Sequence, residues 1–188
     1  MALSPAERAM TPLRRAAEAV EEASALRVEI IRGVLVTAPP PCGKHAGIIN
    51  AVAKQLLGSL PAHLDAFQVA SVSLPDDADD YATPDLMVCD AAFGESDDWL
   101  ADPADVELVV EVVSKGNSTK DTRSMVTWYA DAGIPAYLLI DPRDGTWTLR
   151  TTPRDGEFLG SLRGRFGEGV ELAALGLKIA TDGFVRYA

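Results

Sequence analysis

The strongest strand pattern in the chain is Glu-Leu-Val-Val-Glu-Val-Val at residues 107–113. Its apolar residues are nearly continuous, which is typical of a central strand that is covered on both faces. Residues 118–132 follow as a predicted helix that ends at Gly133, and residues 136–140 form a second short apolar strand. A strand, a helix and another strand in this order predict an α/β unit at the centre of the fold.

The flanking segments extend this unit in both directions. The other predicted helices cover residues 12–25 and 44–57, and the other predicted strands are 27–32, 34–37, 67–74, 86–89, 147–150, 157–162 and 184–187. The predicted fold class is therefore α/β, a single domain in which helices flank a mixed central sheet.

The length of 188 residues suits one domain with a core of its own. Within it we distinguish three parts. An N-terminal helical segment covers residues 1–25, an α/β core covers residues 26–162, and a C-terminal extension, residues 163–188, is expected to pack on that core.

The charge of the chain limits its partners. The sequence has 17 Lys and Arg and 28 Asp and Glu, which gives a net charge of −11. This balance disfavours binding nucleic acid or an anionic membrane over the whole surface, but it allows a local basic cleft. Clustered carboxylates also attract divalent cations.

Further patterns exclude other classes of protein. No stretch approaches the roughly 18–20 apolar residues that a membrane helix needs. Charged residues interrupt the first 25 positions, so we expect no export signal and a cytoplasmic location. Two cysteines, Cys42 and Cys89, are too few for a disulfide scaffold and are expected to be reduced thiols.

Glu111 is the informative residue of the central strand, because a uniformly apolar segment is expected there. A buried, unpaired carboxylate costs several kcal/mol, so it needs compensation by a salt bridge, a raised pKa or a metal ion. Asp85 begins another short strand, directly after Pro84. On neighbouring strands the two carboxylates would be close enough to share a hard divalent cation, and oxygen ligands of this kind suit Mg²⁺ or Mn²⁺.

Other interpretations of the acidic residues stay open. Glu111 could instead form a salt bridge with an arginine such as Arg27 or Arg32, in a protein with a structural or partner-binding role. The acidic run at residues 76–80 predicts a loop that is exposed to solvent.

Several segments in a fixed order resemble a known family. They are Glu29-Ile-Ile-Arg-Gly-Val-Leu35, Thr83-Pro-Asp-Leu-Met-Val88, Leu108-Val-Val-Glu-Val-Val-Ser114, Asp121 through Tyr129, Ala132-Gly-Ile-Pro-Ala-Tyr137 and Ile140-Asp-Pro142. This set resembles the Uma2 family of the PD-(D/E)XK nuclease superfamily. The resemblance implies a restriction-endonuclease-like fold, metal-dependent hydrolysis of phosphodiesters, nucleic acid as the substrate and a homodimer.

The resemblance also implies roles for particular residues. Asp85 and Glu111 would bind a Mg²⁺ or Mn²⁺ ion, and the backbone carbonyl of Val112 would be a third ligand. Glu29 would complete or tune this site from the first strand. His45, at the head of a predicted helix, matches a position where the family often has histidine, although a solvated residue at a helix start is an alternative.

The chain departs from the family pattern at the catalytic lysine. The superfamily places it two residues after the Glu, where this chain has Val113. The Uma2 family usually moves it into the following helix, where this chain has Met125. Lys115 and Lys120 are the available substitutes. The alternative function is therefore a catalytically impaired nuclease fold that binds nucleic acid or a protein.

The helix over residues 118–132 leaves one further question. Asp121, Met125 and Tyr129 are spaced along one helix face, which the nuclease interpretation turns toward the site. Otherwise Tyr129 belongs to the core and Asp121 is a first-turn acid. Trp128 is predicted to be a core residue.

Overall fold

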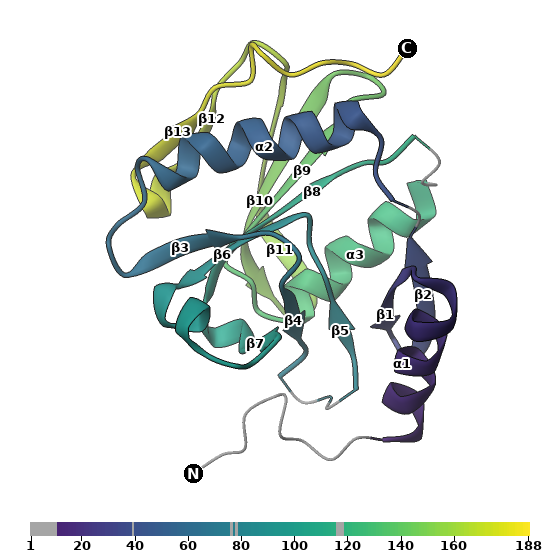
Figure 1. Cartoon of the computed structure of the whole chain (residues 1–188). Coiled ribbons are helices and arrows are strands. Elements are labelled where there is room, and N and C mark those ends of the chain that lie inside the picture. The colour runs from purple at the N-terminus through teal and green to yellow at the C-terminus, as the bar shows by residue number, and fades with distance from the viewer. Residues whose placement is uncertain (1–10, 39, 76, 78, 116–118) are drawn as a thin grey trace.

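Two large β-sheets, a two-stranded sheet near the C-terminus and the helices packed against them make up the described part of the fold (Figure 1). The computed structural model describes residues 11–38, 40–75, 77, 79–115 and 119–188, and for residues 38 and 119–122 it describes the backbone only. The larger sheet has six strands in the order β11-β10-β9-β8-β6-β3, and the smaller one has five in the order β2-β1-β5-β4-β7. The predicted α/β fold with a mixed central sheet and flanking helices is confirmed.

The strands of the six-stranded sheet are β3 (Leu64–Phe67), β6 (Leu86–Asp90), β8 (Val106–Val112), β9 (Ala136–Asp141), β10 (Thr146–Arg154) and β11 (Glu157–Arg165). The central strand β8 runs parallel to β9 and antiparallel to β6. The crossover from β8 to β9 is α3 (Thr119–Asp131), which agrees with the strand-helix-strand unit predicted from the sequence.

Helices cover both faces of this sheet, as Figure 1 shows. Leu108, Val110 and Val112 of β8 belong to the core that packs under α2 (Gly43–Leu57), whereas Val109 faces the second core under α3. Because side chains alternate between the faces of a strand, Glu111 belongs to the α3 face. Trp128 of α3 is fully buried there, which confirms it as a core residue.

The five-stranded sheet contains β1 (Arg27–Ile31), β2 (Val34–Ala38), β4 (Ser71–Ser73), β5 (Tyr81–Ala82) and β7 (Leu100–Ala101). Its first two strands form a tight hairpin. The turn residues Arg32 and Gly33 have φ values of 55° and 71°, which matches the right-handed twist of a two-residue hairpin. Helix α1 (Pro12–Ser24) packs its buried Ala17 against β1.

The predicted strand at residues 67–74 is wrong, because the chain leaves one sheet and enters the other within it. Phe67 ends β3 in the six-stranded sheet, and Ser71 begins β4 in the five-stranded sheet. Between them Val69 has a φ of 65° and is 80% exposed. Alternating polarity therefore arose here from two short strands on different sheets.

The prediction of a solvated loop at residues 76–80 is wrong for Asp80, which is 2% exposed. Its carboxylate accepts hydrogen bonds from the backbone N–H of Arg32 at 2.8 Å and of Gly33 at 3.0 Å. It also accepts one from the indole N–H of Trp128 at 2.9 Å. Asp80 thus connects the β1–β2 hairpin to α3.

The C-terminal part of the chain packs beside α2. The hairpin of β12 (Val170–Leu172) and β13 (Leu177–Ile179) contributes to the core under that helix, together with Phe184. Residues 184–187 do not form the predicted strand. Instead, the backbone N–H of Tyr187 bonds to the carbonyl of Pro142, which holds the tail over the β9–β10 turn.

The helices and the two cysteines can be described in the same terms as in the sequence. None of the helices in the described part of the chain has the length and apolar character needed to cross a bilayer. Both cysteines are free thiols, Cys42 at the surface and Cys89 in the core. Three short helices, η1 (Ala91–Glu95), η2 (Pro103–Asp105) and η3 (Ala173–Leu175), join strands that follow each other in the chain.

Candidate active site

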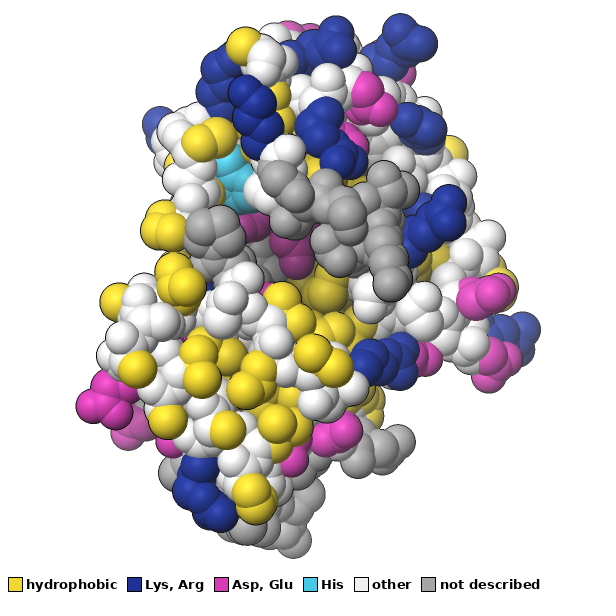
Figure 2. Space-filling model, turned by 90° about the vertical axis from the view of Figure 1, so that its right-hand side faces the viewer, with side chains coloured by type: hydrophobic (Ala, Val, Ile, Leu, Met, Phe, Trp, Pro, Cys, Tyr) yellow, Lys and Arg dark blue, Asp and Glu magenta, His cyan; other side chains and the backbone are white. Residues whose placement is uncertain are grey.

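A cleft of about 840 Å³ lies where the two sheets meet. One wall is the β1–β2 hairpin, and the floor is formed where β6 begins and β8 ends. Its lining includes Glu29, Asp85, Glu111, Val112 and Lys115. Figure 2 shows this hollow with acidic side chains inside, a histidine at its edge, apolar side chains on one side and Lys and Arg on the other.

The strand register brings Asp85 and Glu111 together. The last pair of the antiparallel β6–β8 ladder is Leu86 with Val110, so one further step places Asp85 opposite Glu111. Residues directly opposite each other in such a pair share a face and have Cβ atoms about 4.5–5.5 Å apart. Two carboxylates that are 26 positions apart in the sequence are therefore neighbours at the floor of the cleft.

Each of these carboxylates also contacts a neighbouring polar group. Asp85 accepts a hydrogen bond through Oδ2 from the backbone N–H of Val112 at 2.8 Å. Its Oδ1 lies 3.0 Å from Nε2 of His45, at the start of α2. Glu111 accepts a hydrogen bond through Oε1 from the Tyr129 hydroxyl at 2.7 Å. Tyr129 therefore combines the two roles that the sequence left open, since it is buried in the core and it contacts the site.

Glu29 reaches the same cleft from the other sheet. Its Oε1 accepts a hydrogen bond of 2.7 Å from the backbone N–H of Thr83, two positions before Asp85. This bond fixes the segment that leads into β6. The hairpin strand β1 thus adds a third carboxylate to the cleft.

Burial and like charge disturb the ionisation of these acids. Burial raises the pKa of Glu111 well above its ordinary value, and the charges of Asp85 and Glu29 raise it further. Burial is also the main reason that the pKa of Glu29 is raised, with Asp85 adding to it. Arg27 is the cation that opposes both shifts. A bound cation would relieve the same repulsion.

Glu111→Gln is therefore expected to stabilise the metal-free protein, raising its Tm by about 3 °C or more at pH 8. The folded protein holds the Glu111 proton more tightly than the unfolded chain, so stability falls as pH rises from 4.5 toward the raised pKa. Glutamine removes this loss and still accepts the Tyr129 hydrogen bond. Thermal melts in EDTA from pH 4 to pH 8 measure the effect.

The gain from Glu111→Gln should shrink toward zero near pH 4, where the unfolded carboxylate is also protonated. Glu107→Gln, at the other end of the same strand, is the matched control, because it removes a carboxylate from β8 outside the cleft. A Glu111→Gln variant that melts below the wild type at pH 8 would contradict the conclusion that the charged form of Glu111 destabilises the metal-free protein.

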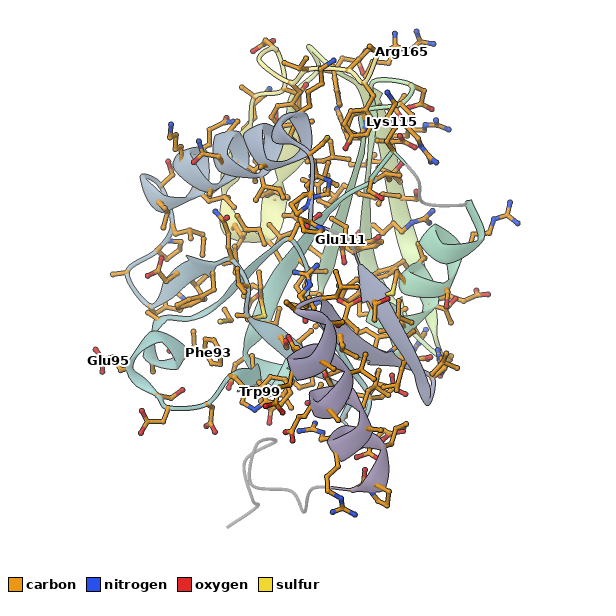
Figure 3. All side chains as sticks on the ribbon, turned by 45° about the vertical axis from the view of Figure 1, so that its right-hand side comes forward. Phe93, Glu95, Trp99, Glu111, Lys115 and Arg165 are labelled. Carbon is orange, nitrogen blue, oxygen red and sulfur yellow. The ribbon has the colours of Figure 1, made fainter. Side chains whose placement is uncertain are left out.

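Apolar side chains occupy the two positions at which the family pattern has its catalytic lysine. Val113 is buried, and Met125 is partly buried at the cleft wall. Of the two substitutes, Lys115 is exposed and lines the cleft beyond the end of β8, apart from Glu111 in Figure 3. Lys120 lies on α3, and its side chain is outside the described residues, as is that of Asp121.

The structure does not support a salt bridge between Glu111 and an arginine. Arg32 pairs with Asp131 instead. Arg27 lies in the cleft and lowers the pKa of Glu111, but no described basic side chain approaches Glu111 within ion-pair distance. Two features compensate this partly buried carboxylate, namely the hydrogen bond from the Tyr129 hydroxyl and the raised pKa of Glu111 itself.

The cleft contains oxygen and nitrogen donors that a metal ion could use. Among the described residues no three His, Cys, Asp or Glu side chains already converge as a metal site. The donor chemistry nevertheless fits a divalent cation, since Asp85 and Glu111 supply oxygens. The carbonyl of Val112 points to the same side of β8 as its N–H, which is the side of Asp85. The buried Nε2 of His45 also makes no hydrogen bond within the described chain.

Sequence reasoning assigned no role to Tyr187 and considered Arg27 only as a possible salt-bridge partner of Glu111, although both line the cleft. Tyr187 donates a hydrogen bond of 2.9 Å to the carbonyl of Val113, and its hydroxyl oxygen lies 3.5 Å from Nδ1 of His45. No local pattern could have shown this, because the tail reaches the site by folding back across α2.

A mixed sheet flanked by helices, with a carboxylate cleft where two neighbouring strands meet, agrees with the restriction-endonuclease-like class of α/β proteins. The model of the Uma2 family, described as "Putative restriction endonuclease", matches residues 15–181, and the chain belongs to this family. A comparison with curated proteins finds no match.

One solved structure shows the same architecture. A crystal structure of "a putative nuclease belonging to DUF820 from Anabaena variabilis" is similar with a TM-score of 0.62 at 17% identity, covering 86% of this chain and 90% of that one. At this identity the likeness establishes the fold. A cryo-EM structure of a DrdV–DNA complex matches with a TM-score of 0.39 and 11% identity, over 80% of this chain and 12% of that one.

Proposed function

We propose that the chain is a metal-dependent nuclease that hydrolyses phosphodiester bonds in nucleic acid. Its membership of the Uma2 family, described as "Putative restriction endonuclease", supports this function. The observation that carries it is the pairing of Asp85 and Glu111 across the β6–β8 register, at the floor of an open cleft. Two carboxylates of like charge would destabilise the fold if no cation or other binding partner compensated their repulsion.

Particular residues would hold the metal ion. Asp85, Glu111 and the carbonyl of Val112 would bind Mg²⁺ or Mn²⁺, ions that favour oxygen ligands. When bound, such an ion polarises the scissile phosphate and lowers the pKa of an attacking water. Glu29 positions the Thr83–Asp85 segment through its hydrogen bond and adds negative charge beside the site.

A metal titration tests this function without a guess about the substrate. We expect Mn²⁺ to bind the wild type saturably below a few millimolar, measured by electron paramagnetic resonance, and Asp85→Ala and Glu111→Ala each to lose that binding. Glu107→Gln is the control on the same strand as Glu111 and should bind as the wild type does. Binding that is absent in the wild type, or indifferent to both substitutions, would overturn the proposal.

Lys115 would contact the phosphate backbone at the rim of the cleft, and its exposure and its position in the cleft lining support this role. Lys115→Ala is expected to weaken binding of a labelled oligonucleotide a few-fold in EDTA. The magnitude of the slope of log affinity against log salt concentration should fall by about 1, the change expected when one phosphate contact is lost. Fluorescence anisotropy at several salt concentrations measures both quantities.

The control for Lys115→Ala is Lys54→Ala, an exposed lysine on α2 that does not line the cleft. It should leave both the affinity and the salt slope unchanged. Equal losses in the two variants would show that Lys115 acts through net charge rather than by contact.

The apolar residues at the lysine positions favour a second candidate function, a nuclease fold that binds nucleic acid or a protein without cutting. Val113 is buried and Met125 offers no charge to the cleft. Incubation of metal-loaded protein with DNA and RNA distinguishes the two functions, since binding without cleavage in both Mg²⁺ and Mn²⁺ would establish the second. The homodimer and the cytoplasmic location stay predictions from the sequence.

A further inference from the structure

We propose that His45 is a metal ligand beside Asp85 and that the resulting nitrogen–oxygen site binds Mn²⁺ in preference to Mg²⁺. This inference rests on the proposed metal site and assigns it a further ligand. Nε2 of His45 lies 3.0 Å from Oδ1 of Asp85 in the cleft. The residue is 5% exposed, and among the described residues its Nε2 has no hydrogen-bond partner.

The 3.0 Å separation matches two ligands of one ion. Two donors that each lie about 2.1 Å from a cation and at a right angle to each other are about 3.0 Å apart. In that arrangement the Asp85 oxygen lies about 45° off the axis of the imidazole nitrogen, which is poor geometry for a hydrogen bond. A short contact without a hydrogen bond is what this pair of atoms shows.

The surroundings of the imidazole leave Nε2 free to bind. The single hydroxyl proton of Tyr187 is donated to the carbonyl of Val113 at 2.9 Å. The oxygen of Tyr187 lies 3.5 Å from Nδ1 of His45, so it can accept a hydrogen bond from Nδ1 in the tautomer that carries its proton there. The lone pair of neutral imidazole is then on Nε2, next to Asp85. Tyr187 is a positioning residue, because it acts through His45.

The ligand set selects among metals by its chemistry. Mg²⁺ is bound almost entirely by oxygen, whereas imidazole suits transition metals. A site with one imidazole, carboxylate oxygens from Asp85 and Glu111 and a backbone carbonyl therefore favours Mn²⁺ over Mg²⁺. It would also accept other first-row ions such as Zn²⁺ or Fe²⁺.

Pulsed electron paramagnetic resonance of the Mn²⁺-loaded full chain tests the proposal directly, because a nitrogen ligand couples to the manganese electron spin. We expect the wild type to show one directly bound nitrogen and His45→Ala to lose it. Mn²⁺ affinity should fall about tenfold or more in this variant. Mg²⁺ affinity, measured by competition, should change less than that of Mn²⁺. His45→Gln, which keeps the bulk of the side chain, should also lose the nitrogen signal.

His63→Ala is the matched control, because His63 is the other histidine of the chain and lies exposed outside the cleft. It should keep the nitrogen signal and the Mn²⁺ affinity. Tyr187→Phe should keep the nitrogen ligand while weakening Mn²⁺ binding, which separates positioning from ligation.

The outcomes separate this inference from the function on which it rests. If the wild type binds Mn²⁺ through Asp85 and Glu111 but shows no nitrogen coupling, the His45 assignment is overturned and the carboxylate site stands. Undiminished Mn²⁺ affinity in a folded His45→Ala variant overturns it as well. If the wild type binds no Mn²⁺ at all, the proposed function and this inference both fail.

Discussion

Asp85→Asn is expected to lower the rate of metal-dependent cleavage at least about 100-fold and to weaken Mn²⁺ binding by a similar factor. Asparagine has nearly the same shape, and its oxygen can still accept the hydrogen bond from the Val112 N–H. The substitution therefore removes the negative charge that faces Glu111 while it preserves the local structure. It has the largest expected effect on function of any substitution considered.

The Asp85→Asn experiment needs a cleavage assay and a metal titration on the same samples. Asp90→Asn, at the other end of β6, is the control and should leave both quantities unchanged. Thermal melts of the metal-free variants should agree with the wild type within a few degrees. Full cleavage activity in a folded Asp85→Asn variant would remove this residue from the proposed mechanism.

Asp80→Ala is expected to have the largest effect on stability, with a loss of about 3–5 kcal/mol. The substitution removes the acceptor of three donors, namely the buried indole N–H of Trp128 and the backbone N–H groups of Arg32 and Gly33 in the hairpin turn. For a chain of this length the loss corresponds to a fall in Tm of roughly 10 °C. Thermal and urea denaturation measure it independently.

Asp77→Ala is the matched control for Asp80→Ala, because Asp77 belongs to the same acidic run but is exposed. Its carboxylate accepts hydrogen bonds from the backbone of Asp79 and Asp80, so a loss of about 1 kcal/mol is expected. An Asp80→Ala variant that melts within 2 °C of the wild type, a change typical of roughly 1 kcal/mol or less, would show that the three donors find other partners.

Asp80 also links stability to the proposed site. It ties the β1–β2 hairpin, which carries Glu29 and Arg27, to helix α3, which carries Tyr129. Loss of this connection would loosen the hairpin wall of the cleft relative to its floor. Asp80 and Asp85 are close in sequence but differ in role. Asp80 connects the β1–β2 hairpin to α3, whereas Asp85 would bind the proposed metal ion.

Much of the architecture could be predicted from local patterns. The apolar run at 107–113 became β8, with the helix and strand after it in the expected order. The interruption of this run by Glu111 indicated a candidate site residue, because a carboxylate in an apolar strand needs compensation. The prediction of one strand at residues 67–74 failed, because alternating polarity indicates which side chains are buried but not which sheet they belong to.

The sequence by itself determined the α/β fold, the central strand and the candidate pair Asp85 and Glu111, because hydrophobic periodicity acts over a few residues and is written locally. Only the tertiary structure decided that Asp80 is buried and that His45 and Tyr187 meet Asp85 and Val113. Those contacts join residues far apart in the chain. Their partners are set by how the two sheets and the C-terminal tail pack, and no short segment records that packing.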